Sequence, residues 1–184
     1  MPRQELSAHE IRSLLTDLGQ RLQDKGVDAT IYIVGGAAIA LEMDTRRVTA
    51  DIDAIFHPET TVAKVAAELA KERGLQSDWL NQSARAYLPG EDDVGAVVLD
   101  IPGLSVTLAS PQHLLAMKMA AFRPRDIPDL ELLFRRLRIT TPERAADLAL
   151  SLYGEESVVL PDREELILSA QAVLNRMSRS KRGR

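Results

Sequence analysis

Two stretches, Ile31-Tyr-Ile-Val-Gly-Gly36 and Thr49-Ala-Asp-Ile-Asp-Ala-Ile-Phe56, decide the fold of this chain. The first is a β-branched and aromatic run that ends in a glycine pair, which indicates a strand followed by a tight turn. A helix is expected to open directly from that turn, over residues 37–42. The second stretch predicts another strand over residues 51–56. A strand, a helix and a second strand in this order indicate a small sheet covered by helices.

The rest of the chain alternates strands and helices up to about residue 109 and is helical after it. A capping box from Ser7 to Glu10 begins a helix that ends at Gly26. The other expected elements are a helix over 58–74, a hairpin of strands 96–101 and 104–108, and helices near 111–122, 127–138, 142–153 and 162–177. The segment 75–93 is predicted to be irregular.

This pattern predicts an α/β protein of the α+β kind, in which an all-helical half follows a small mixed sheet with flanking helices. We expect an α/β core over 1–109, a helical subdomain over 110–177 and a basic, disordered tail over 178–184. The chain has 184 residues, which suits one domain, or one catalytic domain with a small helical appendage.

The composition restricts the chemistry that is available to the chain. It contains no cysteine and 3 histidines, which are scattered at positions 9, 57 and 113. Disulfides, thiolate metal sites and a cysteine nucleophile are therefore excluded, and a histidine-rich zinc site is not expected. Any metal has to bind to carboxylates, which favours magnesium or manganese.

The glycine pair and the two aspartates of the second strand suggest complementary parts of one site. Asp51 and Asp53 lie two residues apart on a strand and so point to the same face, where they repel unless a cation neutralises them or water surrounds them. A glycine turn that opens a helix lets the backbone approach a phosphate closely. A phosphate site beside paired carboxylates is typical of phosphoryl or nucleotidyl transfer. Asp100 is a candidate third carboxylate, the alternative being an edge residue before the Pro102 turn.

The pattern Val34-Gly35-Gly36 … Thr49-Ala-Asp51-Ile-Asp53 resembles the signature of the DNA polymerase β-type nucleotidyltransferase superfamily. The later block from His113 to Leu130 resembles that of the AbiEii and MenT toxin-like branch, which contains toxins of toxin–antitoxin systems. The resemblance covers roughly residues 28–135. The general superfamily pattern has Gly-Ser with the carboxylates close behind it, whereas Gly-Gly with a longer insert fits the toxin-like branch.

The resemblance implies a role for each residue of the first motif. Asp51 and Asp53 would hold the catalytic Mg²⁺ (or Mn²⁺), and Gly35 and Gly36 would contact the triphosphate of a nucleoside triphosphate. Asp100 lies outside this motif, and its position near a strand end makes it the candidate for a third metal ligand or for the carboxylate that activates the attacking group, which is expected to be a 3′-hydroxyl.

The resemblance also implies roles for the helical block. Lys118 would meet the triphosphate charge, although it can also lie on an outer helix face. Asp126 and Asp129 would orient Lys118 or Arg123 or act near the nucleophile. The alternative is that they cap and brace the next helix, and Asp126 fits an N-cap.

Thr49 precedes Asp51 by two residues and would lie beside the metal and phosphate. Related toxins carry Ser or Thr at this place, and in some of them it is phosphorylated by the cognate antitoxin. Thr49 is therefore a candidate regulatory site, the alternative being an ordinary strand-edge threonine. Arg46 and Arg47 are candidate phosphate ligands or part of a solvated loop.

The distribution of charge indicates which kind of molecule could accept the transferred nucleotide. Residues 175–184 hold five basic and no acidic side chains, and the stretch 118–138 has a net charge of +3. These segments can form a track for an RNA backbone, the alternative for the tail being a solvated terminus. The expected RNA contacts are Arg123, Arg125, Arg135 and Arg136.

The leading hypothesis is a cytoplasmic nucleotidyltransferase toxin that adds a nucleotide to the 3′ acceptor end of transfer RNA. Its expected partners are a nucleoside triphosphate, transfer RNA and a cognate antitoxin, with no membrane. One alternative is an enzyme that transfers AMP to a protein. The other is a non-catalytic member that binds nucleotide or antitoxin.

Overall fold

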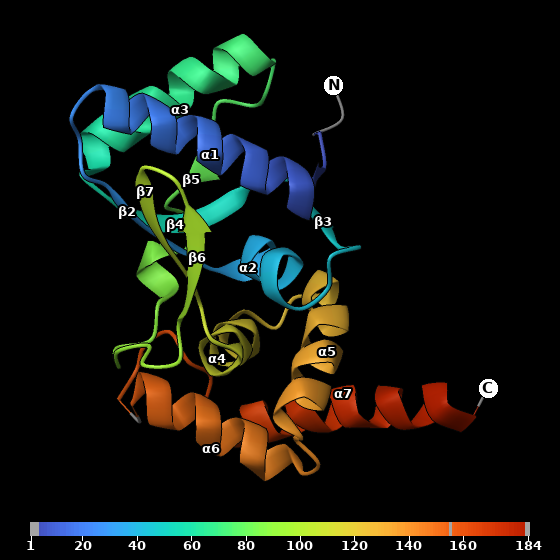
Figure 1. The fold of residues 1–184 in the computed structure, drawn as a ribbon. Coiled ribbons are helices and arrows are strands. Elements are labelled where there is room, and N and C mark those ends of the chain that lie inside the picture. The colour runs from blue at the N-terminus through green and yellow to red at the C-terminus, as the bar shows by residue number, and fades with distance from the viewer. Residues whose placement is uncertain (1–3, 155, 183–184) are drawn as a thin grey trace. The chain divides into compact units, whose positions relative to one another are not determined.

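The computed structural model describes residues 4–154 and 156–182. It has the α/β class expected from the sequence, with a five-stranded mixed sheet and a helical C-terminal part (Figure 1). The chain divides into two compact units, the first made of residues 1–86 and 96–109 and the second of residues 87–95 and 110–184. The first unit corresponds to the expected α/β core, except that segment 87–95 belongs to the second.

The sheet of the first unit is built around one central strand. Its order is β5 (Leu80–Asn81), β4 (Ile52–His57), β2 (Thr30–Ile33), β7 (Leu104–Leu108) and β6 (Val97–Ile101). Strand β2 is antiparallel to β4 and parallel to β7, and β6 and β7 form the expected hairpin. Strand β5 lies in the segment that was expected to be irregular, because a two-residue strand leaves no alternating pattern in the sequence.

One face of this sheet is buried under two helices, α1 (Ala8–Asp24) and α3 (Glu59–Arg73) (Figure 1). Ile31, Ile33, Ala54 and Val106 lie on this face and are almost completely buried. Helix α1 approaches the hairpin turn so closely that a Cβ at Gly19 would lie 2.4 Å from the carbonyl oxygen of Pro102. These aliphatic contacts make the core of the first unit.

The opposite face of the sheet has no fully buried side chain among its paired strand residues. Tyr32, Ile55 and Thr107 are partly exposed, and Val98 is 76% exposed. Because side chains alternate along a strand, this pattern identifies a sheet that is covered on one side only. Asp53 lies on the partly exposed face, since its neighbours Ile52 and Ala54 lie on the buried one.

A helix and a short strand pair complete the first unit. Helix α2 (Gly35–Glu42) starts at the glycine pair and buries its aliphatic residues. Strand β3 (Val48–Thr49) pairs with the short strand β1 (Leu6–Ser7), which directly precedes α1. The expected capping box of α1 is present, because the Ser7 hydroxyl accepts from the Glu10 N–H and Glu10 accepts from the Ser7 N–H.

The second unit is made of helices α4 (Pro111–Ala121), α5 (Ile127–Leu137), α6 (Pro142–Tyr153) and α7 (Arg163–Arg182), with a short 3₁₀ turn at Pro124–Asp126. Another 3₁₀ turn, at Arg85–Tyr87, lies where the chain passes from the first unit to the second. Small residues of α6 pack against α7, and Ala145, Ala149 and Ala170 are fully buried. None of the helices in the described part of the chain combines the length and apolar character that crossing a bilayer needs.

Segment 87–95 is held in the second unit by polar contacts with α4. The Ser110 N–H donates to Asp93 Oδ2 over 2.8 Å, and the buried His113 ring lies 3.2 Å from Asp93 Oδ1 and 3.0 Å from the carbonyl oxygen of Glu91. Sequence spacing gives no indication of these contacts, because they join residues that are about 20 positions apart.

Helix α7 extends beyond the point where the sequence predicts a disordered tail. It reaches Arg182, and the last two residues of the expected tail, 183 and 184, lie outside the described residues. Buried Leu166, Ala170 and Val173 attach the helix to the unit, and Arg176 pairs with Glu131 over 2.9 Å. Lysine and arginine are good helix formers, so basic composition does not end the helix at residue 177.

Candidate functional site

The glycine turn opens α2 without a capping side chain. Val34 occupies the N-cap position and makes no side-chain hydrogen bond to the first turn. The first N–H groups of a helix have no partner within the helix, and they carry the positive end of its dipole. Gly35 has a φ of 63°, a backbone conformation that residues with a Cβ rarely adopt. This turn therefore has the geometry that suits an anion such as a phosphate.

Side chains from three segments approach the glycine turn. A Cβ at Gly35 would lie 3.4 Å from Asp53 Oδ2, and a Cβ at Gly36 would lie 3.1 Å from Thr49 Oγ1 and 3.5 Å from Arg47 Nη2. The absence of side chains at both glycines leaves room between a carboxylate on one side and a guanidinium and hydroxyl on the other. The structure thus brings together Gly35, Gly36, Arg47, Thr49 and Asp53.

We expect Gly36→Val to impair nucleotide binding more than folding. The added branched side chain would occupy the space beside Thr49 and Arg47, whereas the backbone of Gly36 has no positive φ that would be strained. The KM for a nucleoside triphosphate should rise by about tenfold or more, which corresponds to about 1.4 kcal/mol of lost binding. The matched control is Gly90→Val, since nothing lies within 4 Å of a Cβ at that loop glycine. Equal KM values for the two variants would contradict a ligand site at the turn.

The two aspartates of the second motif are placed by β4. Asp51 precedes the strand and Asp53 lies in it, and both are partly exposed. The amide of Asn81 donates from Nδ2 to Asp51 Oδ2 over 3.4 Å, and β5 places Asn81 beside Asp53. The Thr49 hydroxyl donates to the carbonyl oxygen of Asp51 over 3.1 Å. Two strands and a side-chain amide therefore fix the position of the pair.

Asp100 does not join this pair, which corrects the prediction of a third carboxylate. The register places Asp100 opposite Ser105, which pairs with Thr30 at the beginning of β2, whereas Asp53 lies near the end of β2. Four residues along the strands and three strand spacings separate the levels of Asp100 and Asp53, roughly 13 Å and 14 Å. The sequence places Asp100 near a strand end, but it does not show which end of the sheet that is.

In an assay of nucleotide transfer, the variant Asp100→Asn is therefore expected to match the unchanged protein within about twofold, because an exposed substitution far from the carboxylate pair has little effect. The measurement is the initial rate at saturating triphosphate. A loss comparable to that of Asp51→Asn would show that Asp100 reaches the site in the active protein.

The carboxylate pair fits a magnesium site. Mg²⁺ commonly binds proteins through one or two carboxylates and completes its octahedral shell with water and substrate phosphates. The described residues contain no cluster of three or more His, Asp or Glu side chains that would favour a metal held by the protein alone. Asp51 and Asp53 are accordingly the residues that would hold the ion, together with the phosphates of a nucleotide.

A buried ion cluster lies in the second unit. Lys118 Nζ lies 2.5 Å from Asp126 Oδ1 and 2.8 Å from Asp129 Oδ2, and Arg123 Nε lies 3.0 Å from Asp126 Oδ2. The three side chains of Lys118, Asp126 and Asp129 are 11%, 3% and 2% exposed, so the charges compensate one another away from water. Lys118 thus lies between two aspartates rather than on an outer helix face.

Asp126 does not cap α5, contrary to one of the alternatives from the sequence. Its backbone is already helical and its carboxylate makes no capping bond, because it is engaged by Lys118 and Arg123. Burial by itself would raise the pKa of Asp126, but the hydrogen bond and charge of Lys118, and then those of Arg123, outweigh burial and lower the pKa below its ordinary value.

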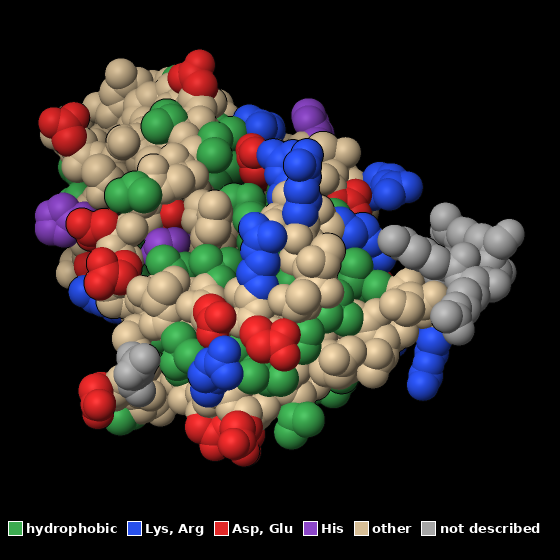
Figure 2. Space-filling view, turned by 90° about the horizontal axis from the view of Figure 1, so that it is seen from below, with side chains coloured by type: hydrophobic (Ala, Val, Ile, Leu, Met, Phe, Trp, Pro, Cys, Tyr) green, Lys and Arg blue, Asp and Glu red, His purple; other side chains and the backbone are tan. Residues whose placement is uncertain are grey.

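The four arginines that were expected to contact RNA also belong to the second unit, and all are exposed. Arg123 pairs with Asp126, and Arg135 pairs with Glu131 over 3.1 Å. Figure 2 shows basic and acidic side chains side by side on one face of the molecule rather than one continuous basic surface. On the face that Figure 2 shows, basic side chains therefore have acidic neighbours.

Two residues at the site were missed by sequence reasoning. Asn81 lies in the segment expected to be irregular, where an asparagine is ordinary and gives no signal. Tyr32 lies on the same sheet face as Asp53, because it is aligned with Ile55 two residues farther along β4. The alternation of side chains along β2 and β4 shows that Tyr32 and Asp53 share a face only when the register of the two strands is known.

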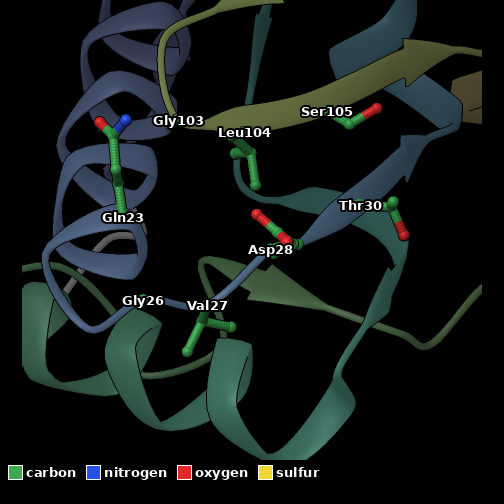
Figure 3. A pocket seen from close by; sticks show the side chains of 9 residues that line it. Gln23, Gly26, Val27, Asp28, Thr30, Gly103, Leu104 and Ser105 are labelled. Carbon is green, nitrogen blue, oxygen red and sulfur yellow. The ribbon is translucent and has the colours of Figure 1, made fainter.

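A cavity of about 390 Å³ lies at the other end of the first unit (Figure 3). Residues at the end of α1, the beginning of β2 and the hairpin turn line it, among them Gln23, Asp28, Thr30 and Gly103. None of the candidate site residues is among its lining residues. Among the described residues, the cavity and the carboxylate pair are therefore separate features of the first unit.

Comparison with known proteins places the chain among nucleotidyltransferases. A family model described as "Nucleotidyltransferase of unknown function (DUF6036)" matches residues 9–151. No curated protein matches the chain. Among solved structures, the chain is similar to an antigenic nucleotidyltransferase-like protein from Paracoccidioides brasiliensis, with 17% identity and a TM-score of 0.45 over 98% of this chain and 92% of that one.

Proposed function

Because the chain belongs to the DUF6036 family of nucleotidyltransferases of unknown function, we propose that it transfers a nucleoside monophosphate from a nucleoside triphosphate to the 3′ end of an RNA. The observation that carries this proposal is the close approach of Asp53 and Arg47 to the two sides of the uncapped glycine turn. A carboxylate that can share a cation with phosphates, a helix N-terminus and a guanidinium are the groups that a triphosphate needs.

Different residues of the site bind the two ends of the triphosphate. The N–H groups of the Gly35-Gly36 turn and the Arg47 guanidinium hold the outer phosphates, which become the leaving pyrophosphate. Asp51 and Asp53 lie at the α-phosphate end, where they would hold a Mg²⁺ ion, or Mn²⁺ in its place. When bound, the ion supplies charge neutralisation and a template for the phosphate oxygens. Asn81 keeps the Asp51 carboxylate in position.

The reaction is an in-line displacement at the α-phosphorus. A bond forms between the 3′-oxygen of the acceptor and the α-phosphorus, the bond to the bridging oxygen of the pyrophosphate breaks, and pyrophosphate leaves. The strand register places Asp100 far from the carboxylate pair. A carboxylate oxygen of Asp51 or Asp53 therefore accepts the proton of the attacking hydroxyl. The chain then contributes mainly positioning and charge compensation.

An RNA acceptor is favoured over a protein acceptor by the exposed arginines of the second unit. The exposed Arg125 supplies positive charge that a polyanion can use, and α7 continues as a helix into the basic C-terminal segment. The acceptor end of transfer RNA and a role as the toxin of a toxin–antitoxin system, acting in the cytoplasm, complete the proposal. They rest on the resemblance to the AbiEii and MenT toxin-like branch.

Thr49 is proposed as the point at which a cognate antitoxin switches the enzyme off. Its side chain is partly exposed and lies beside Gly36, and its hydroxyl contacts the backbone of Asp51. A phosphate on this hydroxyl would add negative charge where the triphosphate binds, and it would fill the space beside the glycine turn. Phosphorylation of Thr49 would therefore block binding of the triphosphate at the glycine turn.

The test is incubation with each α-³²P-labelled nucleoside triphosphate, Mg²⁺ and either total RNA or total cell protein. We expect label in RNA, which periodate oxidation of the RNA 3′ ends should abolish. Label in protein would replace the RNA proposal by an AMP-transferring enzyme. Absence of transfer with all four triphosphates would favour a member that only binds nucleotide or antitoxin.

A further inference from the structure

We propose that Tyr32 and its neighbours on the exposed face of the sheet form a stacking shelf for the 3′-terminal base of the RNA acceptor. The shelf is the row Ile55, Tyr32, Thr107 and Val98, which crosses the sheet beside the carboxylate pair. This inference rests on the proposed function, because it identifies where the acceptor of that reaction binds.

The register of three strand pairs defines the shelf. Tyr32 is aligned with Ile55 of β4 and with Thr107 of β7, and Thr107 is aligned with Val98 of β6. Aligned residues of paired strands share a face, so these four side chains form one continuous row. All four side chains are partly or fully exposed. The residues that flank Tyr32 in β2, Ile31 and Ile33, point to the opposite face and are buried under the helices.

The shelf lies next to the reacting centre. Ile33 is aligned with Ala54, so that Asp53 lies at the level of Val34, whose N–H donates to the Asp53 carbonyl oxygen over 2.9 Å. Tyr32 is two residues back along β2, roughly 7 Å along the strand and one strand spacing across from Asp53. That separation is comparable to the reach of one nucleoside, so a base on the tyrosine ring can present its own 3′-hydroxyl to the site.

The direction of the reaction assigns the shelf to the acceptor rather than to the triphosphate. In phosphoryl transfer the attacking and leaving oxygens lie roughly in line. Asp53 lies at the level of Val34, so the glycine turn follows that level along β2, whereas Tyr32 lies two residues before it. If pyrophosphate leaves toward Gly35 and Gly36, the acceptor hydroxyl has to approach from the side of the shelf.

The chemistry of the row suits a base. Aromatic side chains stack on nucleobases with little dependence on sequence, and the protein has 3 Phe, 3 Tyr and 1 Trp. Trp79, Phe56 and Phe134 are buried, and Phe122, Tyr87 and Tyr153 are outside the sheet. Tyr32 is accordingly the aromatic residue on the exposed face of the sheet, with aliphatic Ile55 on one side and the Thr107 hydroxyl on the other.

The experiment compares Tyr32→Leu, which removes the ring but keeps apolar bulk, with Tyr32→Phe, which keeps the ring. Transfer to bulk transfer RNA is measured for both. The acceptor KM of Tyr32→Leu should rise roughly 5- to 150-fold, the range for loss of one stacked base. The KM for the triphosphate should not change, and Tyr32→Phe should stay within about threefold of the unchanged protein. A rise in the triphosphate KM instead, or no change in the acceptor KM, would overturn the proposal.

A binding measurement separates failure of the shelf from failure of the proposed function. The probe is a short single-stranded RNA with 2-aminopurine at its 3′ end, whose fluorescence is quenched on stacking. The unchanged protein and Tyr32→Phe should quench it, and Tyr32→Leu should not. Tyr87→Ala is the control for an exposed tyrosine outside the sheet. Quenching that depends on Tyr32 without any transfer would retain the shelf and reject the enzyme. Transfer without such quenching, or transfer to protein alone, would reject the shelf.

Discussion

Replacing Asp53 by asparagine should lower nucleotide transfer by about 10²- to 10³-fold, the usual cost of removing one group that stabilises charge in a transition state. The substitution keeps the shape of the side chain and removes its charge, so one of the two carboxylates that would hold the proposed Mg²⁺ is lost. The fold should not suffer, because Asp53 is partly exposed and two strands hold its backbone. The measurement is the initial rate at saturating triphosphate and Mg²⁺, with thermal unfolding recorded in parallel.

The matched control for this variant is Asp28→Asn. Asp28 is an exposed carboxylate just before β2, at the end of the strand opposite to the glycine turn, where it lines the cavity of the first unit. The same change of charge there should leave the rate within about twofold. If Asp53→Asn keeps more than a tenth of the activity, or if both variants lose it equally, the pair is not the catalytic centre.

The largest expected loss of stability comes from Lys118→Met. This substitution keeps an unbranched side chain of similar length but removes the ammonium that lies between the buried carboxylates of Asp126 and Asp129. Removing one partner of a buried ion pair typically costs about 3–5 kcal/mol, because the charge that stays buried loses its counter-ion and water does not replace it. The free energy of unfolding, measured by urea titration at neutral pH, should fall by this amount.

The control for this second prediction is Lys64→Met on the exposed surface of α3, which should change the free energy of unfolding by about 0.5 kcal/mol or less. A loss of that size for Lys118→Met as well would show that the two aspartates find other partners or take up protons at little cost. The structure would then not explain why an apolar helix carries a lysine at this position.

Acid titration gives an independent check on the same cluster. The pKa of Asp126 is lower in the folded protein than its ordinary value of 3.8. The stability that this carboxylate contributes is therefore fully present above about pH 3.8, and it is lost as the pH falls through the lower pKa of the folded state. The difference in unfolding free energy between the unchanged protein and Asp126→Asn should shrink in that acid range and be constant above it.

The expectations from the sequence succeeded where local signals agree. The capping box at Ser7 and Glu10, the glycine turn and the Pro102-Gly103 hairpin each need only neighbouring residues, and each is present in the fold. The alternation of Asp51 and Asp53 with buried neighbours also follows from one strand alone. These signals were enough to predict the fold class and the glycine turn beside Asp53.

What the sequence could not provide depends on register and on long-range pairing. Asp100 lies on the expected strand, but only the pairing of β6 with β7, and of β7 with β2, shows that it lies at the wrong end of the sheet. Asn81 contacts Asp51 through a two-residue strand that has no pattern of its own. The carboxylate of Asp126 was open to two interpretations until the positions of Lys118 and Arg123 were known.

The most direct test of the central claim compares α- and γ-³²P-labelled triphosphates in parallel reactions with the same RNA. Attack at the α-phosphorus, with the outer phosphates held at the glycine turn, predicts that the α label enters the RNA and the γ label appears in pyrophosphate. Both signals should fall together in Asp53→Asn. Entry of the γ label into an acceptor, or its release as inorganic phosphate without transfer, would contradict nucleotidyl transfer at the carboxylate pair.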